Sequence, residues 1–109
     1  MSDTIIQVTD SSFTKDVLQS KQPVVVDFWA TWCRPCLMMA PTFEAVSKEY
    51  AGKVTFAKMD TDENQDTPMQ FYIQGIPTMI LFKDGQMTKK IVGAMPKRRL
   101  EAELEPALA

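Results

Sequence analysis

Two cysteines separated by two residues are the clearest chemical signal in this sequence. Cys33 and Cys36 are the only cysteines of the chain, with Arg34 and Pro35 between them. Such a pair can form and break a disulfide, or it can supply two ligands of a zinc site. A structural zinc site needs four ligands, and the chain has no histidine and no third cysteine. The spacing therefore predicts a redox-active dithiol and no metal site.

The cysteines lie between a predicted buried strand and a predicted helix. Residues 24–29 read Val-Val-Val-Asp-Phe-Trp, without the alternation of a strand that has one face in water. Beyond Cys36, apolar residues recur at helical spacing, and we expect Pro41 to kink this helix without ending it. The unpaired N–H groups and the dipole of a helix N-terminus favour a thiolate. We therefore expect Cys33, at the exposed end, to attack a substrate disulfide and Cys36 to resolve the mixed disulfide.

A single carboxylate interrupts the predicted buried strand. Burial of Asp27 is costly unless the group has a partner or a raised pKa. One interpretation places Asp27 on the wet face of a one-sided strand. The other buries Asp27 and lets it move a proton to and from Cys36. The absence of alternation favours the second interpretation, and Lys58, on a neighbouring predicted strand, is the candidate partner of Asp27.

Length and composition limit the class of protein. A chain of 109 residues predicts one domain over residues 1–109. A net charge of −2 gives no reason to expect nucleic acid as a partner, and no apolar run is long enough to span a membrane. The first residues have no features of an export signal, so we expect a cytoplasmic location, and we expect a monomer. In the cytoplasm a close cysteine pair is more typical of redox chemistry than of a structural disulfide.

The remaining patterns predict the element order β-α-β-α-β-α-β-β-α, an α/β fold. The first three strands are joined through helices and can be parallel, whereas the last two form an antiparallel hairpin around Asp84 and Gly85, a pair that suits a turn with positive φ. Residues 9–12 are candidate caps of the first helix, and a short helix is expected over residues 67–72. Residues 60–66 imitate the opening of a calcium loop but lack its glycine, so we expect a solvated loop there.

Three motifs resemble the thioredoxin family. They are Trp-Cys-Arg-Pro-Cys at residues 32–36, Gly-Ile-Pro-Thr at residues 75–78, and Val-Gly-Ala at residues 92–94. The resemblance covers nearly the whole chain and keeps the family's order. It implies a three-layer α/β/α thioredoxin fold with a central five-stranded mixed sheet flanked by four helices. It also implies an enzyme that reduces disulfides of other proteins, binds no cofactor beyond its own cysteine pair, and is re-reduced by a thioredoxin reductase.

The resemblance also implies roles for residues outside the cysteine pair. Asp27 and Lys58 take the family's buried proton-transfer positions, in agreement with the interpretation above. Pro77 corresponds to the family's cis-proline beside the cysteines, although a trans proline that begins a strand is the commoner state of such a bond. A cis bond would place the backbone of Ile76 where it can pair with an extended substrate segment. The expected docking surface is formed by Trp32, Ile76, Pro77, Gly93 and Ala94.

Arg34 departs from the family pattern, which usually has glycine at this position. We expect the two residues between the cysteines, Arg34 and Pro35, to tune the redox potential. A guanidinium near the Cys33 sulfur stabilises the thiolate, and so the reduced form. We expect a shift in the oxidising direction of at most about 30 mV.

Two other functions are compatible with parts of the sequence. An oxidase or isomerase of the same fold is expected to have histidine between the cysteines and an export signal, and neither is present. A non-catalytic interaction module would keep its function when both cysteines are replaced by serine. The enzyme interpretation predicts complete loss of function in that variant.

Overall fold

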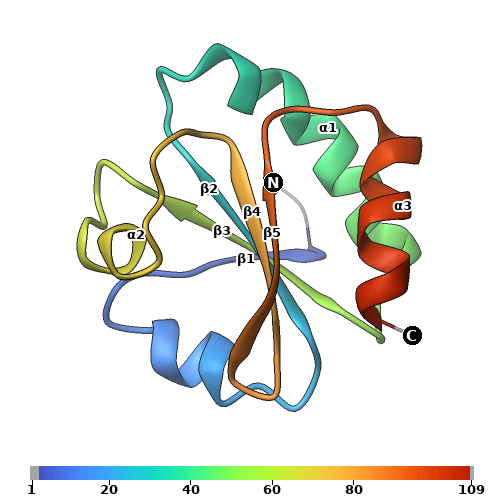
Figure 1. Ribbon diagram of the computed structural model, residues 1–109, viewed down its shortest axis with the longest axis horizontal. Helices are drawn as coiled ribbons and strands as arrows, with labels where there is room; N and C mark the ends of the chain where they lie inside the picture. Colours follow the sequence, from blue (N-terminus) through green and yellow to red (C-terminus); the bar gives the residue numbers. More distant parts are fainter. Residues whose placement is uncertain (1–2, 109) are drawn as a thin grey trace.

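The computed structural model describes residues 3–108. Within this range, five strands form one mixed sheet and four helices cover its two faces (Figure 1). The strands are β1 (Ile5–Gln7), β2 (Val24–Trp29), β3 (Thr55–Asp60), β4 (Thr78–Lys83) and β5 (Gln86–Val92). The helices are the π-helix η1 (Thr14–Leu18), α1 (Arg34–Glu49), α2 (Asp66–Gln70) and α3 (Lys97–Leu108). The predicted α/β class and element order are confirmed.

The strand that precedes the cysteines is the central strand of the sheet. The spatial order is β1-β3-β2-β4-β5, in which β1, β3 and β2 are parallel and β4 and β5 are antiparallel to their neighbours. All residues of β2 from Val24 to Phe28 are buried. The apolar run therefore reflects a strand that is covered on both faces, as its sequence predicted.

Two hydrophobic clusters lie on opposite faces of this sheet. The first joins the sheet to α1 and α3, and the second joins it to η1, with Phe71 packed against it directly after α2. Figure 1 shows the same division, with α1 and α3 together on one side of the strands. Because side chains alternate along a strand, Val25 belongs to the first cluster and Val26 to the second. Asp27 therefore lies on the sheet face that α1 covers.

The turn between β4 and β5 has the backbone that the sequence predicted. Asp84 and Gly85 both have positive φ, at 54° and 80°, and the two strands are antiparallel. A side chain at Gly85 would also meet the backbone, because a Cβ atom there would lie 3.0 Å from the carbonyl oxygen of Leu18. Glycine at this position therefore satisfies both the turn and the close approach of η1.

The N-terminus of α2 is held by a side chain from a distant segment. Asp10 was expected among the caps of the first helix, but η1 has no side-chain cap. The carboxylate of Asp10 instead accepts hydrogen bonds from the backbone N–H groups of Asp66, at 3.1 Å, and Thr67, at 2.9 Å. Prediction of this cap failed because it joins residues far apart in the sequence. The hydrogen bonds fix α2 against the segment that follows β1.

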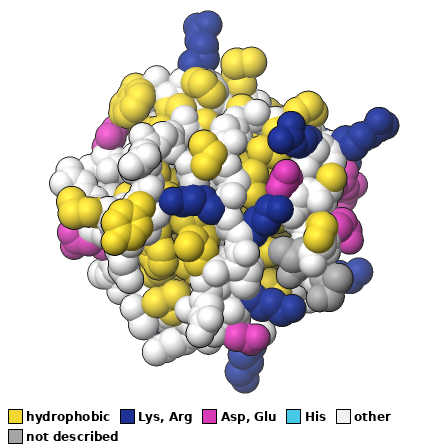
Figure 2. All heavy atoms as spheres, viewed as in Figure 1, with side chains coloured by type: hydrophobic (Ala, Val, Ile, Leu, Met, Phe, Trp, Pro, Cys, Tyr) yellow, Lys and Arg dark blue, Asp and Glu magenta, His cyan; other side chains and the backbone are white. Residues whose placement is uncertain are grey.

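Two adjacent lysines attach the edge strand β5 to both helical layers. Lys89 forms a salt bridge of 3.0 Å with Glu103 of α3. Lys90 donates hydrogen bonds to the carbonyl oxygens of Phe71, at 2.9 Å, and Tyr72, at 3.1 Å, just beyond the C-terminal end of α2. The helix ends earlier than expected, and Tyr72 has a φ of 56°. On the face of the molecule seen in Figure 2, hydrophobic side chains and the side chains of Lys and Arg are interspersed.

Candidate active site

The cysteine pair lies at the junction of β2 and α1. Cys33 and Cys36 form a disulfide with a Cα–Cα distance of 5.2 Å. Cys33 is the N-cap residue of α1, with extended backbone, and Cys36 lies in the first turn. The backbone N–H of Cys36 donates to the Cys33 sulfur at 3.2 Å. After reduction, this donor and the helix dipole would stabilise a thiolate at Cys33.

The segment before β4 covers the outer sulfur. Cys33 is only 4% exposed and Cys36 2%, so the disulfide form lacks the clearly exposed sulfur that was expected at Cys33. Ile76 packs against the cluster that contains both cysteines, and its carbonyl oxygen lies 3.7 Å from the Cys33 sulfur. The carbonyl group of Ile76 is therefore an immediate neighbour of this sulfur.

The segments that carry the expected docking residues meet beside the cysteines. The Ile76–Pro77 peptide bond is cis. The N–H of Gly93 donates to the carbonyl oxygen of Pro77 at 2.8 Å, which brings the segment after β5 to the segment before β4. Ala94 is exposed, and Trp32, which is 68% exposed, lines a shallow pocket together with Ile76. The structure thus places the expected docking residues on the segments around Cys33.

Asp27 is buried without a hydrogen bond. The residue is fully inaccessible, and neither carboxylate oxygen has a hydrogen-bond partner among residues 3–108. Burial raises the pKa of Asp27 to about 7, and the charge of Lys58 partly opposes this rise. The carboxyl group can therefore gain or lose a proton near neutral pH, on the sheet face that the cysteine helix covers.

Lys58 is the neighbour of Asp27 in the sheet but makes no direct ion pair with it among the described residues 3–108. The two residues are register partners on β2 and β3. The Lys58 ammonium lies 5.0 Å from the centre of the Trp29 ring, which is a cation–π contact. Lys58 therefore acts on Asp27 through its charge, while Trp29 holds its side chain.

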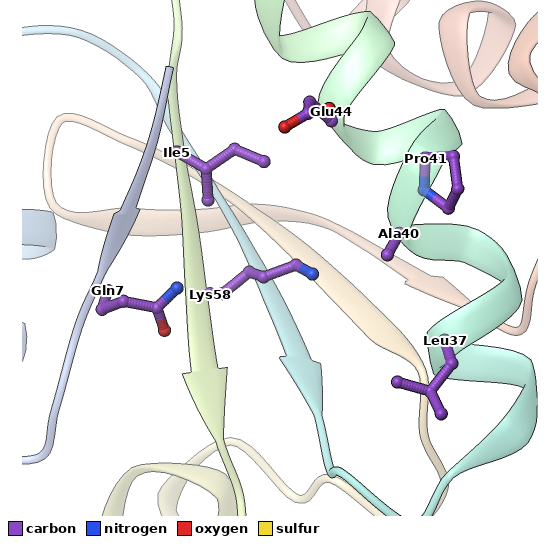
Figure 3. A pocket seen from close by; sticks show the side chains of 7 residues that line it. All are labelled: Ile5, Gln7, Leu37, Ala40, Pro41, Glu44 and Lys58. Atoms are coloured by element: carbon purple, nitrogen blue, oxygen red, sulfur yellow. The ribbon is translucent and has the colours of Figure 1, made fainter. Parts of the chain in front are cut away.

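A pocket opens beside Lys58, between α1 and the β1 edge of the sheet. Its volume is about 400 Å³. Figure 3 shows Lys58 extending from β3 towards α1, with Glu44 on the helix side of the pocket. The remaining wall is mainly apolar and includes Ile5, Leu37, Ala40 and Pro41. The half-buried Lys58 thus lies between an open pocket and the buried carboxyl group of Asp27.

Arg34 and Pro35 occupy the first two positions of α1. Proline is well suited to the first turn of a helix, where its missing N–H leaves no helical bond unmade. Arg34 is exposed and takes part in none of the salt bridges within residues 3–108. Its charge is therefore not neutralised by a carboxylate of the described chain.

Comparison with known proteins decides the family. The family model for thioredoxin matches residues 4–106. The chain is 50% identical to a thioredoxin of Pseudomonas aeruginosa over 105 residues, which are 96% of this chain and 97% of the relative. It is 51% identical to a thioredoxin of Acidithiobacillus ferridurans, over 99% of this chain and 100% of the relative. It is 56% identical to a thioredoxin of Mycobacterium tuberculosis, over 91% and 85%. The chain belongs to the thioredoxin family.

Membership of the thioredoxin family defines the chemistry of the cysteine pair. The fold is the thioredoxin fold, as the motifs predicted, and the protein is a thiol-disulfide oxidoreductase. Its redox centre is the Cys33–Cys36 disulfide. Among residues 3–108, no group of three or more histidine, cysteine or acidic side chains is placed to hold a metal ion. In this family the two sulfur atoms of the disulfide carry the electrons.

One contact at this thioredoxin site was missed in the sequence. The indole N–H of Trp32 donates to the carboxylate of Asp62 at 2.8 Å, although residues 60–66 were expected to form only a solvated loop. The order of the strands contains a signal for this contact. Because β2 and β3 are parallel neighbours, the segments that follow them leave the same edge of the sheet. An acidic residue after β3 can therefore reach a tryptophan after β2.

Proposed function

We propose that this thioredoxin reduces disulfides of other proteins, with Cys33 as the attacking thiolate and Cys36 as the resolving thiol. The observation that carries the proposal is the position of Cys33 at the N-terminus of α1, with the N–H of Cys36 directed at its sulfur. This environment favours the thiolate, which is the nucleophile of disulfide exchange.

The proposed reaction has two exchange steps. The Cys33 thiolate attacks one sulfur of the substrate disulfide, so that a mixed disulfide forms and the other substrate sulfur leaves as a thiolate. Cys36 then loses its proton and attacks the Cys33 sulfur, which releases the second substrate sulfur and forms the Cys33–Cys36 disulfide. Two electrons pass to the substrate in this sequence. A reductase must return them before the next cycle.

We assign Asp27 as the group that accepts the proton of Cys36 in the second step. Its pKa of about 7 is suited to proton transfer at neutral pH, and its position on the α1 side of β2 supports the assignment. Lys58 is its charged partner and keeps the carboxylate form accessible. Both roles agree with those that the family resemblance implies.

The proposed docking surface surrounds Cys33. It consists of Trp32, Ile76, Pro77, Gly93 and Ala94. The carbonyl group of Ile76 lies beside the Cys33 sulfur, so an extended substrate segment that pairs with this backbone would bring its disulfide to Cys33. The exposed indole of Trp32, which lines a shallow pocket with Ile76, would add apolar contact area.

The family assignment supports proposals for the partners and the location of the protein. We propose oxidised proteins as substrates and a thioredoxin reductase as the electron donor, in the cytoplasm, with the protein acting as a monomer. Within residues 3–108, no helix is long and apolar enough to cross a membrane. The single domain expected for residues 1–109 stays a prediction.

Replacement of both cysteines tests the proposed function. The wild-type protein is expected to reduce insulin disulfides with NADPH and a bacterial thioredoxin reductase, and also with dithiothreitol as donor. The double variant Cys33→Ser/Cys36→Ser should be inactive with both donors. Insulin reduction by the double variant above the uncatalysed rate would contradict the proposal. So would a wild-type protein that does not reduce insulin when dithiothreitol is the electron donor.

Arg34→Gly is expected to make the protein slightly more reducing. The exposed guanidinium favours the thiolate form, so its removal should lower the reduction potential by at most about 30 mV. The measurement is the equilibrium between the protein and a glutathione redox buffer. Arg34→Lys keeps the positive charge and serves as the control. Equal potentials for the wild type and Arg34→Gly would show that Arg34 does not tune the redox centre.

A further inference from the structure

The loop between β5 and α3 is attached to both sides of the active site. At one end, the N–H of Gly93 donates to the carbonyl oxygen of Pro77, beside the segment that covers Cys33. Two residues later, the N–H of Met95 donates to the Sδ atom of Met39 at 3.3 Å. Met39 lies on α1, the helix that begins at the cysteines. The loop therefore connects the cis-proline segment to the cysteine helix.

The Met39 sulfur is an unusual partner for a backbone N–H. A thioether is a weak acceptor, and methionine in a core normally serves as flexible apolar filling. Met39 is 2% exposed and belongs to the cluster between the sheet and α1 and α3. Met95 is half-buried and packs against the same cluster. The Met39 sulfur thus accepts a hydrogen bond from the N–H of the half-buried Met95, which would otherwise have to bond to water.

Ala94 lies between these two attachment points. Gly93 and Met95 are half-buried, whereas Ala94 is exposed. Because the N–H groups on either side of Ala94 are both hydrogen-bonded, the loop presents Ala94 outwards in a fixed position. Met39 lies three residues after Cys36, which places the two residues about one turn apart and on the same side of α1. The contact therefore links the position of Ala94 to the helix that carries the resolving cysteine.

We propose that Met39 is a positioning residue for substrate docking, which it controls by holding the Met95 N–H through its thioether. This inference rests on the proposed reduction of protein disulfides, in which Ala94 contacts the substrate. Loss of the thioether leaves the two sulfur atoms of the redox centre in place but releases one end of the loop between β5 and α3, which carries Ala94. Binding of large substrates should weaken, while chemistry on a small disulfide should not.

The test replaces the sulfur while it keeps an apolar side chain of similar size. Met39→Leu removes the acceptor. Met59→Leu is the matched control, because Met59 is equally buried but lies in the cluster on the opposite face of the sheet. For each variant, kcat and KM are measured with insulin and with dithiobis-nitrobenzoate, and hydrogen exchange at the Met95 amide is followed by NMR.

Two changes are expected together in Met39→Leu. The Met95 amide should exchange at least about tenfold faster. The KM for insulin should rise about threefold to tenfold, as for the loss of one hydrogen bond, with kcat and the dithiobis-nitrobenzoate rate unchanged. Met59→Leu should show neither change.

Other outcomes overturn the proposal. An unchanged Met95 exchange rate in Met39→Leu would mean that the sulfur does not hold the amide. Faster exchange with an unchanged KM for insulin would mean that the contact does not serve docking, and an equal rise of KM in Met59→Leu would point to a general loss of packing. If Met39→Leu does not fold, free exchange of the Met95 amide in the wild type overturns the proposal. Failure of the wild type to reduce insulin would instead contradict the proposed function.

Discussion

Cys36→Ser is expected to accumulate a covalent adduct with a protein disulfide, linked through Cys33. The first exchange step needs only the Cys33 thiolate, which the N–H of residue 36 still stabilises after the substitution. The second step needs a thiol at position 36, so the mixed disulfide cannot resolve. Turnover of insulin should fall to the uncatalysed rate. The adduct is detected by non-reducing electrophoresis and its linkage by mass spectrometry.

Cys33→Ser is the matched control for this trapping experiment. Cys36 lies inside the first turn of α1 and lacks the N-cap position that stabilises a thiolate at Cys33, so it should form almost no adduct when Cys33 is absent. An adduct that appears with Cys33→Ser, and not with Cys36→Ser, would reverse the roles of the two cysteines. Equal amounts of adduct in both variants would show that the protein does not direct the substrate disulfide to one of the two sulfur atoms.

Asp27→Asn is expected to stabilise the folded protein at alkaline pH. Burial raises the pKa of Asp27 from 3.8 to about 7, so the folded state holds a proton that the unfolded state has released in this range. The asparagine side chain is neutral at every pH and avoids the burial of a charge. The variant should therefore gain stability relative to the wild type as the pH rises from 4 to 8. The gain approaches about 4 kcal/mol, since each pKa unit corresponds to about 1.4 kcal/mol.

The sign of this effect follows from proton binding. Well below pH 3.8 the aspartate is protonated in both states, so Asp27 adds no pH dependence there. Between about pH 4 and pH 7 the wild type loses stability, because unfolding releases the proton. Urea unfolding of the oxidised proteins at pH 4, 6 and 8 measures the difference between wild type and variant. A difference that does not change with pH would show that Asp27 does not titrate in this range.

The same substitution tests the proposed role of Asp27 in proton transfer. At pH 8 the wild-type carboxylate can accept the Cys36 proton, whereas asparagine cannot. The rate of the resolving step should fall by roughly a hundredfold in Asp27→Asn, the lower end of what general-base catalysis typically contributes. In the wild type this rate should rise with pH through about 7, and the variant should lack the rise. Lys58→Met, which removes the opposing charge, should move the rise to higher pH.

The central features of the site were predictable because they depend on local patterns. The spacing of Cys33 and Cys36, next to a helical repeat, was enough to place the pair at a helix N-terminus. The run around Asp27 lacks alternation, and that alone predicted a carboxylate buried between two layers. The positive φ at Asp84 and Gly85 followed from turn chemistry in the same way.

Features that join distant segments were missed. The burial of Cys33 was not expected, although the family resemblance placed Ile76 beside the cysteines; the approach of Ile76 is set by the pairing of β4 with β2 and not by the residues around the cysteines. The cap of α2 by Asp10 likewise joins segments that no local pattern connects. The thioether contact of Met39 has no signal at all in the sequence, because a buried methionine is normally read as apolar filling.

The two lysines of β5 also bear on self-association. An edge strand exposes backbone groups that could add the strand of another molecule, and charged side chains are a common protection against such growth. Lys89 is held by Glu103 on one face of the sheet, and Lys90 is held by carbonyl oxygens near α2 on the other. A strand added at this edge would place its own side chains beside both ammonium groups and would have to bury their charges or break their contacts. The two lysines thus protect β5, the longer of the two edge strands, against the addition of strands from other molecules.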